Sequence, residues 1–161
     1  MPQIKHKTAL SLILLFSIFA LVAAYFIQYV LGHQPCNLCL IQRIPYIFSI
    51  LIISICLFTE KFEKITLITL SLTFFITTLF SFYHFGIEQG FIMESLVCDL
   101  NVSNNELSKE DLLNQLREVP VSCKNVTFKI FGLSLATFNI FISLVLGAIT
   151  TKIFLTYEKN K

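Results

Sequence analysis

Long apolar stretches dominate the pattern of hydrophobic and polar positions along this chain. They cover residues 8–31, 40–59, 65–83 and 133–151. About 20 consecutive apolar residues are enough to cross a bilayer as a helix, and none of the stretches shows the polar face of a water-exposed amphipathic helix. The pattern therefore predicts an all-α membrane protein, in which residues 1–161 form a single domain built as a four-transmembrane-helix bundle.

The first stretch alone also has features of a cleavable signal peptide. Lys5 and Lys7 precede it, and the small residues 22–24 resemble a cleavage site. The apolar run nevertheless continues to Leu31, which exceeds the apolar region of a signal peptide, and three more stretches follow it. We therefore expect this stretch to be a retained transmembrane helix.

Charged residues beside the stretches predict which side of the membrane each loop occupies. If the helices alternate in direction, one side holds seven lysines, which are Lys5, Lys7, Lys61, Lys64, Lys152, Lys159 and Lys161. Segment 85–131 on the other side holds seven acidic and four basic residues. Because lysine and arginine favour the cytoplasmic side, we expect a multi-pass protein of the bacterial inner membrane. Both termini are then cytoplasmic, and the outer loops 32–42 and 85–131 face the periplasm.

The overall composition agrees with a membrane protein and excludes several classes of function. Hydrophobic residues make up 55% of the chain and charged residues 14%, whereas an average soluble protein has roughly 25% charged residues. The net charge is only +2, and no basic patch is interleaved with aromatic residues, so we expect no nucleic-acid partner. The chain also lacks the glycine-rich loops that bind nucleotides. Membrane lipid is the expected surrounding.

Four of the five cysteines fall in the predicted outer loops. Cys36 and Cys39 lie in the first loop and Cys98 and Cys123 in the second, on the side of the membrane where disulfides form and persist. Four cysteines allow three pairings, of which the simplest by spacing joins Cys36 to Cys39 and Cys98 to Cys123. Cys56 lies inside the second stretch, where a free cysteine packs as a small hydrophobic residue.

The C-x-x-C pair has three interpretations, namely a zinc site, a structural disulfide and a redox dithiol. Zinc is suggested by the series His33, Cys36 and Cys39, with Cys98 or His84 as a further ligand, but no second ligand pair has metal spacing. A structural disulfide across two residues closes almost no loop and removes little unfolded-state entropy. The redox interpretation is therefore favoured.

The surroundings of the pair suit redox chemistry. Cys39 lies where the second helix should begin, so backbone N–H groups and the helix dipole favour its thiolate. Arg43 follows one helical turn later on the same face, where it stabilises either the thiolate or charge on a bound electron acceptor; simple snorkelling to the interface is the alternative. Because haem, iron–sulfur and nucleotide motifs are absent, a lipid-soluble quinone is the acceptor that remains.

Three segments resemble the DsbB family of inner-membrane proteins that reoxidise a periplasmic thiol oxidase and pass electrons to quinone. They are PCNLCLIQR (35–43), FYHFGIEQG (82–90) and FGLSLATFN (131–139). The order of spans, the C-x-x-C in the first outer loop and the two cysteines in the second are also similar, so the resemblance covers essentially the whole chain. One departure is Gln42, where the family often has an acidic residue.

The resemblance implies roles for particular residues. Electrons would pass from a periplasmic DsbA-like thioredoxin-fold oxidase through two catalytic cysteine pairs to ubiquinone or menaquinone. The outer pair is Cys98 and Cys123, with Cys98 as the sulfur attacked, and the inner pair is Cys36 and Cys39, with the thiolate of Cys39 at the quinone. The cofactor-binding residues are Arg43 and His84, and no metal ligand is implied.

Two details stay open at this stage, one at the outer end of the third span and one in the second outer loop. His84 is either beside the quinone or an interfacial histidine bonded to a backbone carbonyl, and it would pair with Glu88 only if the helix continued past Gly86. Ser108 and Asp111 resemble a capping box, and the leucines that follow up to Pro120 predict a short amphipathic interfacial helix. A helix packed over the outer loops is the alternative.

Three other functions compete with this interpretation. The first is a variant of the same enzyme that serves one dedicated partner. The second is a non-catalytic four-span membrane protein that binds metal through its outer cysteines. The third is a quinone enzyme similar to vitamin K reductase, whose C-x-x-C lies near the end of a late span, whereas Cys36 and Cys39 open the second span here.

Overall fold

The structure is a computed structural model that describes residues 2–59, 62–93, 98, 123–124, 128–130 and 132–159. Its elements are, in chain order, α1 (Pro2–Tyr29), α2 (Asn37–Ile41), α3 (Ile44–Thr59), α4 (Glu63–Glu88), β1 (Lys129–Ile130), β2 (Leu133–Ser134) and α6 (Leu135–Lys159). Four segments are long and apolar enough to cross a membrane, with α2 and α3 together forming the second. The predicted all-α, four-span architecture is confirmed, with one short β-hairpin added.

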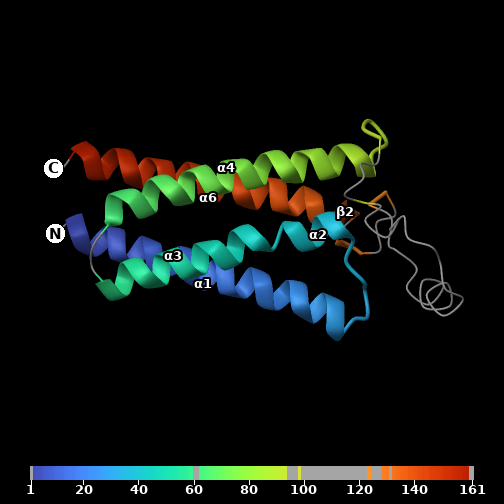
Figure 1. The fold of residues 1–161 in the computed structure, drawn as a ribbon, viewed down its shortest axis with the longest axis horizontal. Coiled ribbons are helices and arrows are strands. Elements are labelled where there is room, and N and C mark those ends of the chain that lie inside the picture. The colour runs from blue at the N-terminus through green and yellow to red at the C-terminus, as the bar shows by residue number, and fades with distance from the viewer. Residues whose placement is uncertain are drawn as a thin grey trace, which may run out of the picture.

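The helices run side by side as a bundle with two distinct ends. Figure 1 shows both termini at one end and the segments around α2 and β2 at the other. The closest pairing is between α4 and α6, and α1 packs mainly against α3. At the end with the termini, Lys64 Nζ of α4 lies 2.8 Å from Glu158 Oε1 of α6. The cysteine-bearing segments therefore lie together, at the end away from the termini.

The core lies along the middle of the bundle, and large apolar side chains also cover its outside. Ile53, Leu67, Leu70 and Phe74 are fully buried, and Cys56 packs among them, as expected for a small hydrophobic residue. Apolar side chains on every span point outward, as expected for helices that face lipid. Buried hydroxyl groups donate to the carbonyl four residues earlier, which satisfies them without water; examples are Ser17, Ser49, Thr77 and Thr150.

The second span is broken, whereas the sequence pattern predicts one continuous helix. Pro45 has no N–H for the carbonyl of Ile41 and its ring crowds that carbonyl, so α2 ends at Ile41. Gln42 and Arg43 form a turn before α3, in which the Arg43 N–H bonds Leu40 O at 3.1 Å. The prediction that Arg43 follows Cys39 by one turn of the same helix is therefore wrong.

Helix α4 continues beyond Tyr83, where the third apolar stretch ends, as far as Glu88. Its end is a Schellman motif, in which the Phe91 N–H bonds Gly86 O at 2.9 Å and the Gly90 N–H bonds Ile87 O at 3.0 Å. Gly90 adopts the left-handed conformation that this motif requires, with φ +76°. Because α4 runs through Gly86, the side chains one turn apart at its outer end can meet.

A β-hairpin with two residues in each strand precedes the last span. Lys129 pairs with Ser134 and Ile130 with Leu133 in antiparallel register, so α6 begins at Leu135 rather than at 133. Ser134 then caps the helix, because its Oγ accepts the N–H of Thr137 at 3.2 Å. The amphipathic helix predicted within the second outer loop lies outside the described residues.

Candidate functional site

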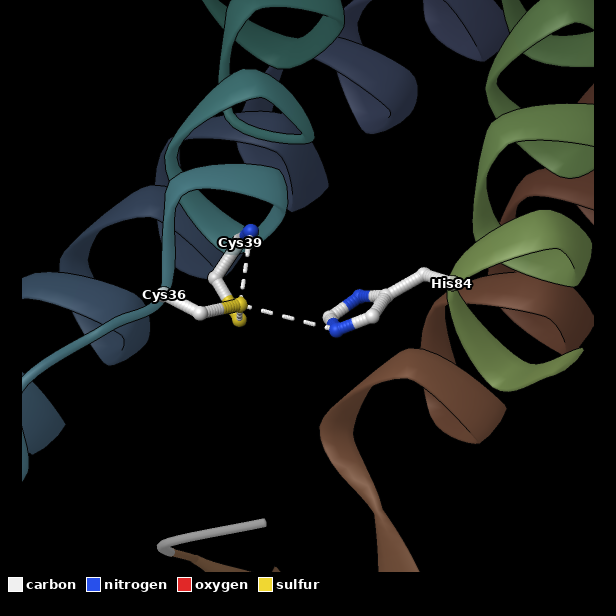
Figure 2. A group of neighbouring side chains, drawn as sticks. All are labelled: Cys36, Cys39 and His84. Atoms are coloured by element: carbon white, nitrogen blue, oxygen red, sulfur yellow. Dashed lines mark hydrogen bonds between the residues drawn. The ribbon is translucent and has the colours of Figure 1, made fainter. Parts of the chain in front are cut away.

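The inner cysteine pair is built on the first turn of α2. Cys36 is the N-cap residue with an extended backbone, and its Sγ accepts the backbone N–H of Cys39 at 3.3 Å. The two Sγ atoms lie 2.7 Å apart as free thiols (Figure 2). The sequence pattern predicts that backbone N–H groups at the start of the helix favour a thiolate on Cys39. Instead, Cys36 occupies the capping position, and the N–H of Cys39 is donated to the sulfur of Cys36.

The electrostatic surroundings make Cys36 the more acidic partner. The pKa of Cys36 falls from its ordinary value to about 5, because the hydrogen bond from the Cys39 thiol and the contact with His84, whose Nε2 is 3.5 Å from the sulfur, outweigh the opposing effect of burial. Cys36 is therefore a thiolate at neutral pH, the form in which cysteine acts as a nucleophile. In this dithiol state the geometry places the thiolate on Cys36, whereas the family resemblance implies Cys39.

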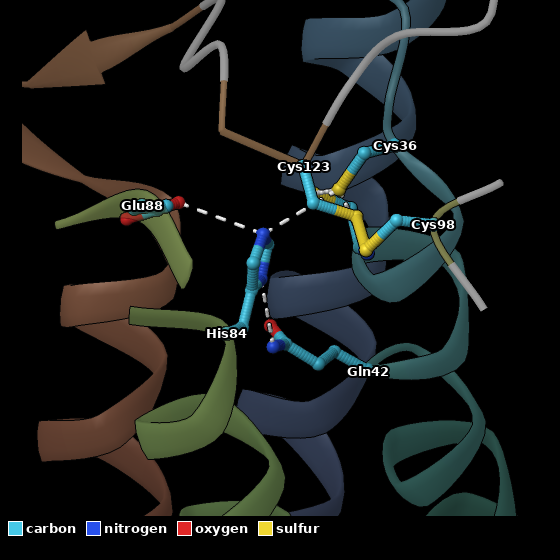
Figure 3. The surroundings of a disulfide bond; sticks show 7 residues. Cys36, Gln42, His84, Glu88, Cys98 and Cys123 are labelled. Atoms are coloured by element: carbon cyan, nitrogen blue, oxygen red, sulfur yellow. Dashed lines mark hydrogen bonds and ion pairs between the residues drawn. A yellow bond between two sulfur atoms is a disulfide. The ribbon is translucent and has the colours of Figure 1, made fainter. Parts of the chain in front are cut away.

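The outer pair is a disulfide that packs directly against the inner pair. Cys98 and Cys123 are bonded with their Cα atoms 5.9 Å apart, and both are buried in one cluster with Cys36 and Ile87. Figure 3 shows the disulfide beside Cys36. The structure thus brings together the same two pairs that are simplest by spacing, with Cys98 and Cys123 bonded and Cys36 and Cys39 as free cysteines beside them.

His84 faces the inner pair from α4, and it is only 2% exposed. Its Nε2 lies 3.5 Å from Cys36 Sγ and 3.6 Å from Glu88 Oε1, while its Nδ1 lies 3.1 Å from Gln42 Nε2 (Figure 3). Both ring nitrogens therefore face side chains rather than a backbone carbonyl. The contact with Glu88 exists because α4 continues through Gly86.

Arg43 is held against α1 and lines the same cavity as Cys39. Its Nη1 donates to Gln28 Oε1 at 2.6 Å, and its guanidinium carbon lies 4.9 Å from the centre of the Tyr25 ring. Among the described residues, these are the polar and ring contacts of the Arg43 side chain, and neither is with a sulfur atom. Arg43 therefore supplies a fixed positive charge to the cavity rather than a direct partner for a thiolate.

An apolar cavity of about 390 Å³ is lined by Cys36, Cys39 and Cys123. Its volume lies within the usual range of small-molecule sites. Its apolar walls come mainly from α1 and α6 and include Phe16, Phe19, Ala23, Ile27, Phe138 and Ile142. Its polar end is formed by Cys36, Cys39, Arg43, His84, Glu88 and Cys123. An apolar cavity with a few polar groups at one end fits a molecule with a polar ring and a hydrocarbon tail. Glu88 Oε2 is buried at the polar end and has no hydrogen-bond partner among the described residues.

Sequence reasoning missed Asn139, which lies at the centre of a buried polar network. Its amide contacts Gln42, Ser81 and Tyr46 from three other parts of the bundle. The available signal was an asparagine within the last apolar span, because polar residues at such depth are costly and mark functional sites by default. Its partners were not predictable from the local pattern.

The site also contains a set of metal-ligand types. The sulfur atoms of Cys36 and Cys39 and a ring nitrogen of His84 lie within 4.8 Å of one another, and thiolate and imidazole are the ligands that zinc prefers. His33, which the zinc interpretation includes, is not in this group. Its ring packs against Phe128, with 5.0 Å between the ring centres.

Comparison with known proteins agrees with the arrangement of the site. The chain is 28% identical to the uncharacterized protein RP370 of Rickettsia prowazekii (strain Madrid E) over 144 residues, which cover 88% of this chain and 84% of that protein. The family model of the disulfide bond formation protein DsbB matches residues 6–153. With its four spans and clustered cysteines, the chain therefore belongs to the DsbB family, and it is a multi-pass membrane oxidoreductase of disulfide bond formation.

Proposed function

We propose that this protein is a thiol–quinone oxidoreductase that reoxidises a periplasmic DsbA-like thioredoxin-fold oxidase and so supports protein disulfide formation. One observation carries the proposal: the Cys98–Cys123 disulfide packs against the Cys36–Cys39 dithiol, and that dithiol lines an apolar cavity. An outer disulfide suits exchange with a protein, and a dithiol at an apolar cavity suits a lipid-soluble oxidant.

The position of Cys123 supports an order for the thiol exchanges. Cys123 lines the cavity together with Cys36 and Cys39, so Cys98 is the better candidate for attack by the partner. That attack frees Cys123, which then attacks the inner disulfide at Cys36 and releases Cys39 as a thiol. The second partner thiol frees Cys98, and Cys98 displaces Cys36 from Cys123. Each exchange forms one disulfide bond and breaks one.

At the end of this sequence the partner would leave as a disulfide, and the inner pair would hold two electrons as a dithiol. A quinone in the cavity supplies a two-electron, two-proton acceptor, and ubiquinone and menaquinone share this chemistry. Arg43 places a positive charge near the acceptor. With a quinone bound, the Cys36 thiolate and the Cys39 thiol would form a disulfide and give up two electrons and one proton. His84 and Glu88 lie where they could carry that proton, and the second proton of the quinol would come from water.

The orientation in the membrane is part of the proposal. The cysteines lie at the end of the bundle away from both termini (Figure 1). By sequence, the seven lysines before the first span, between the second and third spans and after the fourth span fall on the side of the termini. By the rule that basic residues stay inside, the termini are cytoplasmic and the cysteine end faces the periplasm of an inner membrane. Labelling of Cys98 and Cys123 from outside intact cells after reduction tests this.

The test of function uses purified protein in detergent, a reduced thioredoxin-fold oxidase and a water-soluble quinone analogue, with quinone absorbance as the readout. We expect absorbance to fall with the parent protein and to stay constant with Cys36→Ser. Cys56→Ser is the matched control, because Cys56 lies in the core remote from the cavity, and it should retain turnover. Equal quinone loss with Cys36→Ser would refute the proposal.

A metal-binding protein is the second candidate, because three potential ligand atoms, two cysteine sulfurs and one histidine nitrogen, lie within 4.8 Å of one another. Stoichiometric zinc that survives treatment with a chelator, together with failure of the quinone assay, would favour it. Zinc bound to thiolates would also block alkylation of Cys36 and Cys39, whereas the oxidoreductase has a reactive Cys36 in the absence of metal.

A further inference from the structure

A chain of hydrogen bonds crosses the bundle beneath the cysteines. The Tyr46 hydroxyl of α3 donates to Asn139 Oδ1 of α6 at 2.5 Å. Asn139 Nδ2 donates to Gln42 Oε1, in the turn between α2 and α3, at 3.0 Å. Gln42 Nε2 lies 3.1 Å from Nδ1 of His84 on α4. The chain therefore connects three of the four spans and ends at the histidine that contacts Cys36.

The groups at the cysteine end fix the direction of this chain. His84 Nε2 faces the sulfur of Cys36, which already accepts an N–H from Cys39, and the carboxyl group of Glu88. A neutral imidazole has one donor and one acceptor nitrogen, so Nε2 carries the hydrogen when it faces these acceptors. Nδ1 is then the acceptor, and the NH₂ group of Gln42 is the donor that it requires.

The hydrogen bonds at the Asn139 end of the network require the same orientation of donors and acceptors. With its NH₂ group toward His84, Gln42 presents its carbonyl oxygen to Asn139, which therefore presents its own NH₂ group. The second N–H of Asn139 is directed to Ser81 Oγ at 2.8 Å, and Asn139 Oδ1 accepts from Tyr46 and from Ser143. Both amide hydrogens of Asn139, one amide hydrogen of Gln42 and both amide oxygens thus have a partner in one orientation.

We propose that Gln42 and Asn139 are positioning residues that hold His84 in the tautomer with its proton on Nε2, directed at Cys36. In this tautomer the ring donates to the thiolate, whereas the other tautomer would direct a lone pair at the sulfur. The effect of this tautomer on catalysis rests on the proposed function. The tautomer itself is a property of the resting protein.

The substitution that tests the proposal most directly is Gln42→Glu. A glutamate in place of Gln42 keeps the size of the side chain but has no N–H to donate, so it can only accept. A carboxylate beside Nδ1 favours a proton on that nitrogen. Gln42→Glu should therefore place a proton on Nδ1, either by changing the tautomer or by protonating both nitrogens.

The experiment is nitrogen NMR of chelator-treated, reduced protein labelled with ¹⁵N in its histidines. The chain has three histidines, and the signals of His84 are those that disappear in His84→Gln. We expect a protonated Nε2 and an unprotonated Nδ1 in the parent. Gln42→Leu and Asn139→Leu should give a mixture of tautomers. The matched control is Gln28→Leu, which removes an amide that binds Arg43 instead and should leave the His84 signals unchanged.

A proton on Nδ1 in the parent would overturn the proposal, and so would His84 signals that stay the same in Gln42→Glu. If Asn139→Leu does not fold, the nearly isosteric Gln42→Glu still decides the outcome. The two proposals also fail separately: a parent with the Nε2 proton but no quinone turnover contradicts the proposed function and leaves the tautomer assignment intact.

Discussion

Removal of the Cys39 thiol should raise the pKa of Cys36. In Cys39→Ala the sulfur of Cys36 keeps the backbone N–H of residue 39 and its contact with His84, but it loses the hydrogen bond that contributes most to its acidity. Because the pKa of Cys36 is lowered in the parent, the thiolate is present above about pH 5 and disappears as the pH falls through that value.

The size of the effect follows from the hydrogen bonds at the sulfur. The pKa of Cys36 falls from an ordinary value of 9.0 to about 5, which favours the thiolate by about 5 kcal/mol, at about 1.36 kcal/mol per pH unit. A hydrogen bond to a charged group contributes about 1.5–3 kcal/mol. Loss of the Cys39 thiol should therefore raise the pKa to between about 6 and 7. At pH 6 the ionised fraction would fall from about nine-tenths to between about one-tenth and one-half.

Ultraviolet absorbance of the thiolate, measured against pH, is the assay. Cys98 and Cys123 are replaced by alanine throughout, so that Cys36 has no neighbouring disulfide to attack, and a variant that also lacks Cys36 supplies the baseline. Cys39→Ser is the matched control, because its hydroxyl still donates, and it should keep a low pKa. An ordinary pKa for Cys36 in the parent, or the same pKa in parent and Cys39→Ala, would refute the reasoning.

Three further predictions concern the cavity and the network around it. Arg43→Ala should raise the quinone KM about tenfold or more, since it removes a charged group worth about 1.5–3 kcal/mol, and the Cys98–Cys123 disulfide should stay intact in a thiol assay. Tyr46→Phe should lower the free energy of unfolding by about 1–2 kcal/mol because Asn139 loses a buried donor, whereas Tyr29→Phe, which changes a side chain that is 75% exposed, should leave thermal unfolding unchanged. Chelator treatment should leave quinone turnover unchanged, and a loss restored by zinc would contradict the redox assignment.

The spans and the clustering of the cysteines were predictable because their signals are local. Length and apolarity identify each span, and once four spans alternate, both outer loops must lie at one end. The proline at position 45 also carried a local signal, since a proline removes the hydrogen bond to the carbonyl four residues earlier and so kinks or breaks a helix there. Its effect on Arg43 was missed because the spacing from Cys39 to Arg43 was interpreted as an uninterrupted helical turn.

The polar contacts of the site were not predictable in the same way. Gln42 and Asn139 are 97 positions apart in the chain, and their contact depends on how the second and fourth spans pack. The acidity of Cys36 likewise depends mainly on the Cys39 thiol and on His84, and the contact with His84, 48 positions away in the chain, depends on how the second and third spans pack. By contrast, the link between His84 and Glu88 was expected on the condition that the helix continued, and the end of α4 meets that condition.

Electron stoichiometry tests the central claim most directly. The protein is mixed without oxygen with a reduced thioredoxin-fold oxidase and a quinone, and the partner disulfide and the quinol are counted in the same sample. Because each transfer moves two electrons, the account predicts one quinol for every partner disulfide formed in turnover. With Cys36→Ser it predicts no quinol and at most one partner disulfide per protein molecule, which comes from the Cys98–Cys123 disulfide. Partner disulfides that accumulate without quinol would contradict it.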